Sequence, residues 1–253
     1  MISAISFTQM KRHDKKEGRR LQRVARDSWY SKGIAPQTIL YSGEIFCRHL
    51  KKDSAVLELG PAEGAMTAIL LKRTKDLTVV EGAPEFCKIL RRRFPRLRIE
   101  ESLFENFKPS RRYDVIVMGH VLEHVADPSL VLKLASKWLS RGGRIMAAVP
   151  NASSVHRQAA VLMGLIPSVY HLNASDIHHG HRRVFDPVSF KGVFKSAKLR
   201  VDVFGGYWLK PLSNAQIEQT WTPAMLHAFM RLGEKHPDIA AEIYVVASLS
   251  KRS

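Results

Sequence analysis

The sequence predicts an α/β fold built on a mostly parallel, doubly wound sheet. Apolar runs of four to six residues alternate with helical segments, a pattern typical of βαβ units. The first run leads straight into a glycine-bounded turn, and the second ends in a carboxylate, Glu81. At 253 residues the chain is long enough for one large domain with a buried core. We therefore expect a single domain over residues 1–253 with an inserted cap.

Residues 1–50 are expected to form an N-terminal helical cap. The first part is polar and basic, with Trp29 and Tyr30 as anchors before a turn. Pro36 is a favourable first-turn residue, so a second helix is predicted from there to about Leu50.

Residues 51–150 are predicted to form the core that binds a cofactor, and residues 191–253 the C-terminal part of the sheet. Between them, residues 151–190 break the pattern, with a helix expected at 151–165 and a loop at 167–181. An insertion after the fifth strand lies above the carboxyl edge of the sheet, where it can form a substrate lid. The expected strands are 55–59, 77–81, 97–100, 115–118, 144–149, 200–204 and 242–249; the expected helices of the sheet region are 64–72, one from 84, 129–139 and 213–235.

The turn after the first strand indicates which cofactor binds. No Cβ blocks Gly60 or Gly64, and only a methyl group projects at Ala62, so a ligand can approach the backbone closely. The turn reads G-x-A-x-G-A and departs from the G-x-G-x-x-G of pyrophosphate sites. Glu58 would repel a pyrophosphate, but it suits a cofactor with ammonium and sulfonium groups such as S-adenosylmethionine. Glu81 is placed to accept hydrogen bonds from ribose hydroxyls.

Four segments follow one another over about residues 45–150. They are the E-L-G-x-A-x-G loop, the acidic end of the second strand, the G-H-V-L-E-H-V-x-D-P run at 119–128, and Leu139–Arg144 before the fifth strand. In this order and spacing they resemble the class I S-adenosylmethionine-dependent methyltransferases. Ala62 in place of a middle glycine is one departure that still permits close approach. The resemblance implies S-adenosylmethionine as cofactor, S-adenosylhomocysteine as product, and a seven-stranded sheet with an antiparallel final hairpin.

The same resemblance implies a set of cofactor contacts. It places the adenine after the third strand, with Leu103 against the ring and Glu101 near the exocyclic amine. N-terminal helices of such enzymes close over the cofactor, so Tyr30 and Tyr41 are candidates for contact, with helix packing as the alternative. The expected cofactor-binding residues are Glu58, Gly60, Ala62, Gly64, Glu81, Glu101, Ser102, Leu103, Met118, Gly119 and His120.

A hydroxyl or ammonium acceptor must lose a proton during methyl transfer, and histidine is the natural general base. His120 follows the fourth strand and should face the methionine end of the cofactor. His156 lies just beyond the fifth strand, and His181 lies in a G-H-x-R-x-F-type segment. These three are the catalytic candidates. The alternative for His120 is a structural hydrogen bond and that for His181 is a role in shaping the lid, whereas His124 is expected to be a packed structural residue.

We expect the substrate to contact Arg157, Arg182 and Tyr207. Arginine binds phosphate or carboxylate through bidentate contacts, and exposure on the surface is the alternative for both arginines. A histidine-rich loop offers ligands of a kind that metals accept, but its spacing matches no zinc pattern, so we predict no metal and a polar loop. That loop contains His171, Asp176, His178, His179 and His181.

The formal net charge is +17, and the basic residues are distributed over several segments. Such a charge attracts anionic partners, among them phosphorylated small molecules, nucleotide-linked sugars, anionic lipids and nucleic acid. A solvated outer face is the alternative. The basic runs are Lys11 to Arg26, Arg91 to Arg98, Arg111-Arg112 and Arg182-Arg183.

Absent motifs narrow the acceptor. Gly119-His120-Val121 stands where base-methylating enzymes often carry D/N-P-P-Y, Cys47 and Cys87 are not placed for cytosine-C5 chemistry, and no RNA-binding module flanks the core. We therefore expect O- or N-methylation of a small metabolite, such as a sugar, glycan precursor or natural-product intermediate. The alternatives are an RNA methyltransferase, a non-catalytic cofactor-binding module and, last, a dinucleotide oxidoreductase.

The cellular location is predicted from the absence of membrane-spanning and signal-peptide patterns in the sequence. No apolar run is long enough to span a bilayer, and the start resembles no signal peptide. The two cysteines show no metal spacing, so reduced thiols in the cytoplasm are expected.

Overall fold

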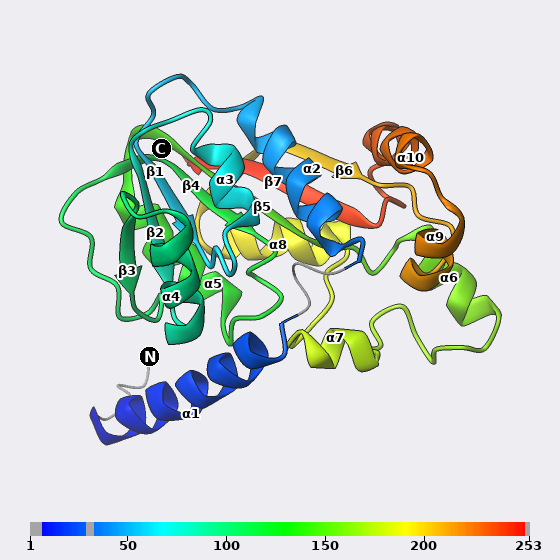
Figure 1. The fold of residues 1–253 in the computed structure, drawn as a ribbon, viewed down its shortest axis with the longest axis horizontal. Coiled ribbons are helices and arrows are strands. Elements are labelled where there is room, and N and C mark those ends of the chain that lie inside the picture. The colour runs from blue at the N-terminus through cyan, green and yellow to red at the C-terminus, as the bar shows by residue number, and fades with distance from the viewer. Residues whose placement is uncertain (1–6, 29–32, 251–253) are drawn as a thin grey trace.

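A computed structural model describes residues 7–28 and 33–250, so Trp29 and Tyr30 lie outside the described residues. Within them, seven strands form one sheet in the order β3-β2-β1-β4-β5-β7-β6 (Figure 1). All neighbouring strands are parallel except β7, which runs antiparallel to β5 and β6. This confirms the predicted doubly wound sheet with its antiparallel final strand. The strands are β1 (Val56–Leu59), β2 (Leu77–Glu81), β3 (Arg98–Glu101), β4 (Tyr113–Gly119), β5 (Leu139–Pro150), β6 (Leu199–Tyr207) and β7 (Glu242–Leu249).

Helices cover both faces of the sheet because its inner strands are apolar on both sides. One face packs against α5 and α8, for example through Trp138 and Phe190, and the other against α2, α3 and α4, through Phe46, Leu70 and Leu90. The helices are α1 (Phe7–Arg26), α2 (Ala35–Cys47), α3 (Ala65–Leu70), α4 (Pro84–Arg93), α5 (Pro128–Trp138), α6 (Val155–Leu162), α7 (Ala174–His178), α8 (Pro187–Ser196), α9 (Asn214–Thr220) and α10 (Pro223–Lys235).

Local sequence explains where several helices begin. Asp127 caps α5 by accepting a hydrogen bond from the Leu130 backbone at 2.9 Å, and Pro128 occupies the first turn. Asp186 and Ser189 form a capping box at the start of α8. Since β1, β2 and β4 are parallel neighbours, their carboxyl ends lie at the same edge of the sheet.

Most predicted boundaries are shifted by a few residues, and three differences have a clear local cause or consequence. β5 begins at Leu139, five residues before the predicted start at 144, because Leu139 pairs with Tyr113. The register then shifts between Tyr113 and Val115. The stretch 213–235 is two helices, since Thr222 caps a new helix that starts at Pro223. The predicted helix over 151–165 is the shorter α6.

The segment 151–190 contains structure that the sequence did not predict. Within the expected loop, Asn173 and Asp176 form a capping box that starts the one-turn helix α7. Figure 1 shows α6 and α7 beyond the ends of the strands, with α7 near α1. Among the described residues, the structure contains no helix of the length and apolarity that a membrane crossing requires.

Candidate active site

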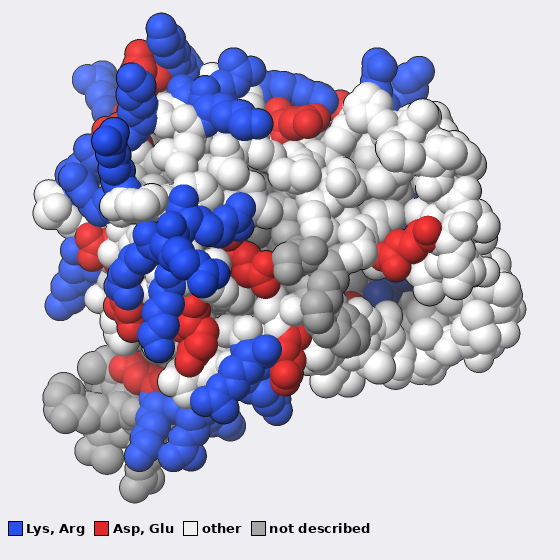
Figure 2. Space-filling model, in the orientation of Figure 1, with Lys and Arg blue, Asp and Glu red and all other residues white. Residues whose placement is uncertain are grey.

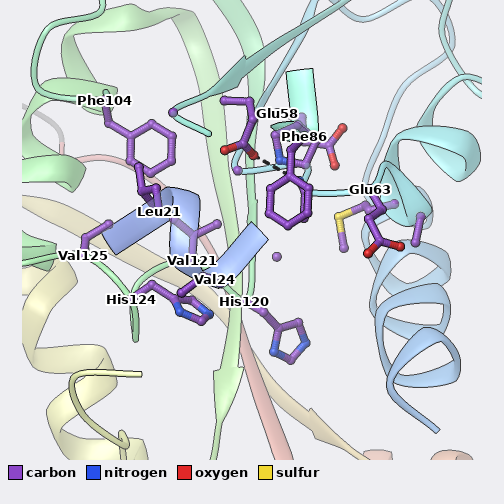
Figure 3. Close-up of a pocket in the computed structure, with 18 of the residues that line it drawn as sticks. Leu21, Val24, Glu58, Glu63, Phe86, Phe104, His120, Val121, His124 and Val125 are labelled. Carbon is purple, nitrogen blue, oxygen red and sulfur yellow. Dashed lines mark hydrogen bonds between the residues drawn. The ribbon is translucent and has the colours of Figure 1, made fainter. Parts of the chain in front are cut away.

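A cavity of about 400 Å³ lies at the carboxyl ends of β1, β2 and β4. Figure 3 shows Glu58 on one wall, Phe86 and Phe104 nearby, His120 and His124 on another, and Leu21 and Val24 of α1 across it. Most expected cofactor residues are part of the lining: Glu58, Gly60, Ala62, Glu81, Ser102, Leu103, Gly119 and His120.

Small residues keep this cavity open. A Cβ on Gly60, which has φ +65°, would lie 3.1 Å from Val121 Cγ2, and one on Gly119 would lie 2.4 Å from Met66 Cε. Ala62 adopts φ +47° in spite of its Cβ, and its backbone N–H donates to Glu81 Oε2 at 3.2 Å. The loop after β1 is therefore fixed to the end of β2, with its backbone exposed to the cavity.

Two buried carboxylates face the same space. Glu58 is 2% exposed and accepts a hydrogen bond from Thr67 Oγ1 at 2.6 Å. Burial raises the pKa of Glu58 to about 8; the nearby Glu81 adds to the rise, and Thr67 opposes it. Burial also raises the pKa of Glu81 to about 7, against hydrogen bonds from the backbone of Ala83 and Ala62. Carboxylates that are costly to ionise in the absence of a ligand fit a cationic cofactor, whose charge compensates theirs.

Three residues expected to contact the cofactor lie off the lining. Met118 is fully buried in the core. Glu101 forms an exposed ion pair with Arg91, with 3.0 Å between Oε2 and the guanidinium. At Gly64, with φ +82°, an added Cβ would meet Phe94 at 2.6 Å, so this glycine serves helix packing.

Helices α1 and α2 cover the cavity. Glu17 of α1 forms an ion pair with Arg182 at 2.6 Å, and Arg20 donates to the Gly180 carbonyl at 3.0 Å. These contacts fasten α1 to the segment that precedes α8. Tyr41 of α2 is not on the lining; its hydroxyl donates to Glu234, away from the cavity.

His120 lies at the end of β4 and adopts φ +58°. Its Nε2 is 2.9 Å from the hydroxyl of Tyr207, and its Nδ1 is 3.5 Å from Glu123 and 3.8 Å from Glu242. Burial works to lower the pKa of His120, but the neighbouring carboxylates of Glu123 and Glu242 outweigh that effect, so the pKa is raised. Tyr207 is fully buried, and within the described residues it is not part of the cavity wall.

A fully buried carboxylate, Glu123, lies among imidazoles beside the cavity. Burial works to raise its pKa, but His120, His124 and His181 outweigh that effect and lower it. Burial, with His181 and Arg20, lowers the pKa of His124 to about 3. His124, expected to be a packed residue, also lines the cavity.

The remaining candidates belong to the segment 151–190 and are not on the lining. Burial, together with the charges of Lys210 and Arg157, lowers the pKa of His156 to about 3. The Arg157 guanidinium donates to the carbonyls of Val169 and His171, so it is bound within its own segment. His181 Nδ1 is 3.2 Å from Asp176, and Arg182 binds the His124 carbonyl at 2.8 Å as well as Glu17.

Sequence reasoning missed the acidic groups around His120 and the cavity-facing side of α1. Glu242 begins β7 and is buried, and burial raises its pKa to about 7. It is distant from β4 in sequence, and β7 brings it close by inserting between β5 and β6. A signal for α1 was present, because Leu21 and Val24 share one helix face.

The fold and this cavity define a doubly wound cofactor-binding domain that is suited to a cationic nucleoside. The chain belongs to the methyltransferase domain family, whose model matches residues 36–202, and it is a class I S-adenosylmethionine-dependent methyltransferase. Its cofactor is S-adenosylmethionine, and the loop after β1 and the carboxylates Glu58 and Glu81 fit this cofactor.

Sequence relatives include enzymes for small molecules and for RNA. The chain is 24% identical over 166 residues to the ubiquinone biosynthesis O-methyltransferase of Aeromonas salmonicida, covering 63% of this chain and 68% of the relative. It is 27% identical over 119 residues to the ribosomal RNA small subunit methyltransferase A of Chlorobium chlorochromatii, covering 46% and 43%. The match therefore spans less than half the length of this ribosomal RNA relative.

Solved structures show the same fold at low identity. The Burkholderia thailandensis 1,6-didemethyltoxoflavin-N1-methyltransferase, with its substrate and S-adenosylhomocysteine bound, has a TM-score of 0.62 at 13% identity and covers 99% of this chain and 94% of its own. The CcbJ methyltransferase from Streptomyces caelestis has a TM-score of 0.59 at 13% identity, covering 91% and 98%.

Proposed function

We propose that this methyltransferase acts on an oxygen or nitrogen atom of a small metabolite, such as a sugar, glycan precursor or natural-product intermediate. The observation that carries the proposal is the position of His120 on the cavity wall, at the strand end next to the cofactor residues. The O- and N-methyltransferases among the relatives and neighbours support it. Phosphorylated or otherwise anionic acceptors are included, given the charge of +17.

The cofactor residues have distinct roles in this proposal. When bound, S-adenosylmethionine supplies an electrophilic methyl group with a sulfur leaving group. Glu58 compensates the positive charge, Glu81 accepts hydrogen bonds from ribose hydroxyls, and the backbone at Gly60 lets the cofactor lie close. Ser102 and Leu103 border the adenine end of the cavity.

His120 is the proposed general base. It is the proton acceptor on the wall at the end of β4, and Tyr207 holds its ring through the 2.9 Å hydrogen bond to Nε2. The negative charge of Glu242, 3.8 Å from Nδ1, stabilises the imidazolium that forms when the ring takes a proton.

RNA is the second candidate acceptor. Lys and Arg gather on the side of the molecule that carries α1, α4 and β3, and the other half of this face carries few charges (Figure 2). The exposed basic residues of α4 are Lys88, Arg91, Arg92 and Arg93. This face and the ribosomal RNA relatives favour a polyanion.

One labelling experiment separates the two acceptors. Protein is incubated with S-adenosylmethionine carrying a labelled methyl group, once with a small-metabolite extract and once with total RNA from the same cells. We expect label in the metabolite fraction and none in RNA above the level of a His120→Asn control. Label confined to RNA would show that the small-molecule proposal is wrong, and label in neither fraction would support a binding module.

A further inference from the structure

Beside the cofactor cavity lies a carboxylate that lacks hydrogen-bond donors. Glu123 is 0% exposed, and in the described part of the chain neither of its oxygens has a hydrogen-bond partner. An unpartnered buried carboxylate is costly, so its environment must supply positive charge. His120 Nδ1, 3.5 Å away, is one source, but it leaves the second oxygen without a partner.

Two further imidazoles surround the same carboxylate. His124 Nε2 is 3.9 Å from Glu123 Oε1, and the His124 and His181 rings pack edge to face with centroids 4.7 Å apart. One ligand atom from each of Glu123, His124 and His181 lies within 4.8 Å of the others. Zinc and similar ions bind such ligands at about 2.0–2.2 Å, so a contraction on the order of 1 Å would close the three around an ion.

The outer partners of these histidines match those of metal ligands. A ligating imidazole usually gives its second nitrogen to a carbonyl or carboxylate, which fixes the ring. His124 hydrogen bonds to the backbone of Gly180, and His181 Nδ1 is 3.2 Å from Asp176 Oδ1. Arg20 and Arg182 bind the carbonyl oxygen of His124, and neither hydrogen bonds to the Glu123 carboxylate.

We propose that Glu123, His124 and His181 bind one divalent transition-metal ion, of the kind that accepts two imidazoles and a carboxylate, such as Zn²⁺, Mn²⁺ or Co²⁺. This set differs from the histidine-rich loop of the sequence analysis, of which it includes only His181. Three protein ligands leave coordination positions open. Because His124 also lines the cavity, an oxygen of the acceptor can take an open position; this second step rests on the proposed function.

The test is ion binding by the full chain, prepared without a tag and stripped with a chelator. Co²⁺ serves as the probe, with its visible absorption and the metal content after dialysis as readouts. We expect one ion per chain, and a dissociation constant for Co²⁺ that is at least about 10-fold higher in Glu123→Gln and in His181→Asn. His179→Asn is the matched control, since His179 is in the same segment but bonds to the Ser175 carbonyl, and it should bind Co²⁺ like the unaltered chain.

Two results would overturn the inference. The first is that the unaltered chain retains no Co²⁺. The second is that His181→Asn binds Co²⁺ with the same affinity as the unaltered chain, which would mean that the ion binds elsewhere and that His120 alone pairs with Glu123. His181 is off the cavity lining, so His181→Asn provides a test even if Glu123→Gln does not fold. Calorimetry with S-adenosylhomocysteine on each variant distinguishes a loss of metal binding from a loss of cofactor binding, because cofactor binding is expected to persist when the metal is lost.

Discussion

At the scale of single residues, Glu81 connects the cofactor cavity to the loop that shapes it. Its carboxylate accepts from the backbone of Ala62 and Ala83 and faces the space expected to hold ribose. Glu81→Gln should weaken S-adenosylhomocysteine binding about 10- to 100-fold, the loss of a charge-assisted hydrogen bond. Calorimetry measures this, with Glu105→Gln as control, because Glu105 also borders the cavity. Equal losses in both variants would contradict a specific role for Glu81.

The pKa values of the two cavity carboxylates predict how cofactor binding depends on pH. Glu58 and Glu81, at about 8 and 7, are partly protonated in the free protein at neutral pH, and a cationic ligand favours their ionised forms. Affinity for S-adenosylmethionine should therefore rise from pH 6 to pH 8, by up to about tenfold per pH unit for each proton released. Calorimetry in buffers of different ionisation enthalpy counts those protons. A pH-independent affinity would refute this linkage.

His120 is expected to matter for turnover and not for cofactor affinity. His120→Asn should lower the methyl-transfer rate by about 10²- to 10⁴-fold, the usual contribution of a general base, with S-adenosylhomocysteine affinity changed only a few-fold. His156→Asn is the comparison, because His156 is buried off the cavity lining. If the His156 variant loses as much activity as the His120 variant, the assignment of the base is wrong.

At the scale of elements, α1 forms one wall of the cavity. Arg20 and the Glu17–Arg182 ion pair fasten it to residues near Gly180. Arg20→Ala should weaken cofactor binding about fivefold to tenfold and speed amide exchange in α1, since bonds to charged donors contribute about 1.5–3 kcal/mol, part of which solvent screening removes. Arg23→Ala, on the exposed side of the same helix, should do neither. Unchanged exchange in the Arg20 variant would mean that other contacts hold α1.

Elements with a strong periodic pattern were predictable, and those defined by long-range pairing were not. β1, β2 and β7 lie where the apolar runs placed them, because their residues are buried wherever the sheet forms. The start of β5 at Leu139 depends on pairing with Tyr113, which no local pattern encodes. The break before Pro223 was visible in the sequence as a Thr-Pro pair but was read as part of one helix.

At the scale of the whole molecule, buried carboxylates make stability depend on pH. The pKa values of Glu58, Glu81 and Glu242 are raised from 4.5 to about 8, 7 and 7, so between about pH 4.5 and 8 these three carboxyl groups hold more protons in the native state than in the unfolded state. The free energy of unfolding should therefore fall as pH rises from 6.5 to 8. Other shifted groups act outside this range, because the buried histidines with lowered pKa change stability mainly below pH 6.5 and Lys210 changes it mainly above pH 8.

A thermal melting series without cofactor measures this effect. The melting temperature should drop by on the order of 5 °C between pH 6.5 and 8, with a smaller drop in Glu58→Gln. Glu44→Gln, a surface carboxylate on α2, is the control and should melt like the unaltered chain. A melting temperature that rises over this range would contradict the burial of ionisable carboxylates in the folded protein.

The amino-acid sequence by itself determined the class of fold, the cofactor and most of the expected residues that line the cavity, because these depend on short segments: a strand, the turn after it and one acidic residue at a strand end. Only the tertiary structure decided what surrounds His120. Glu123 follows three residues later, but Tyr207 and Glu242 come from the last two strands, and His181 reaches Glu123 from another segment. Residues far apart in sequence meet there because β7 inserts antiparallel beside β5, and no local periodicity specifies that placement.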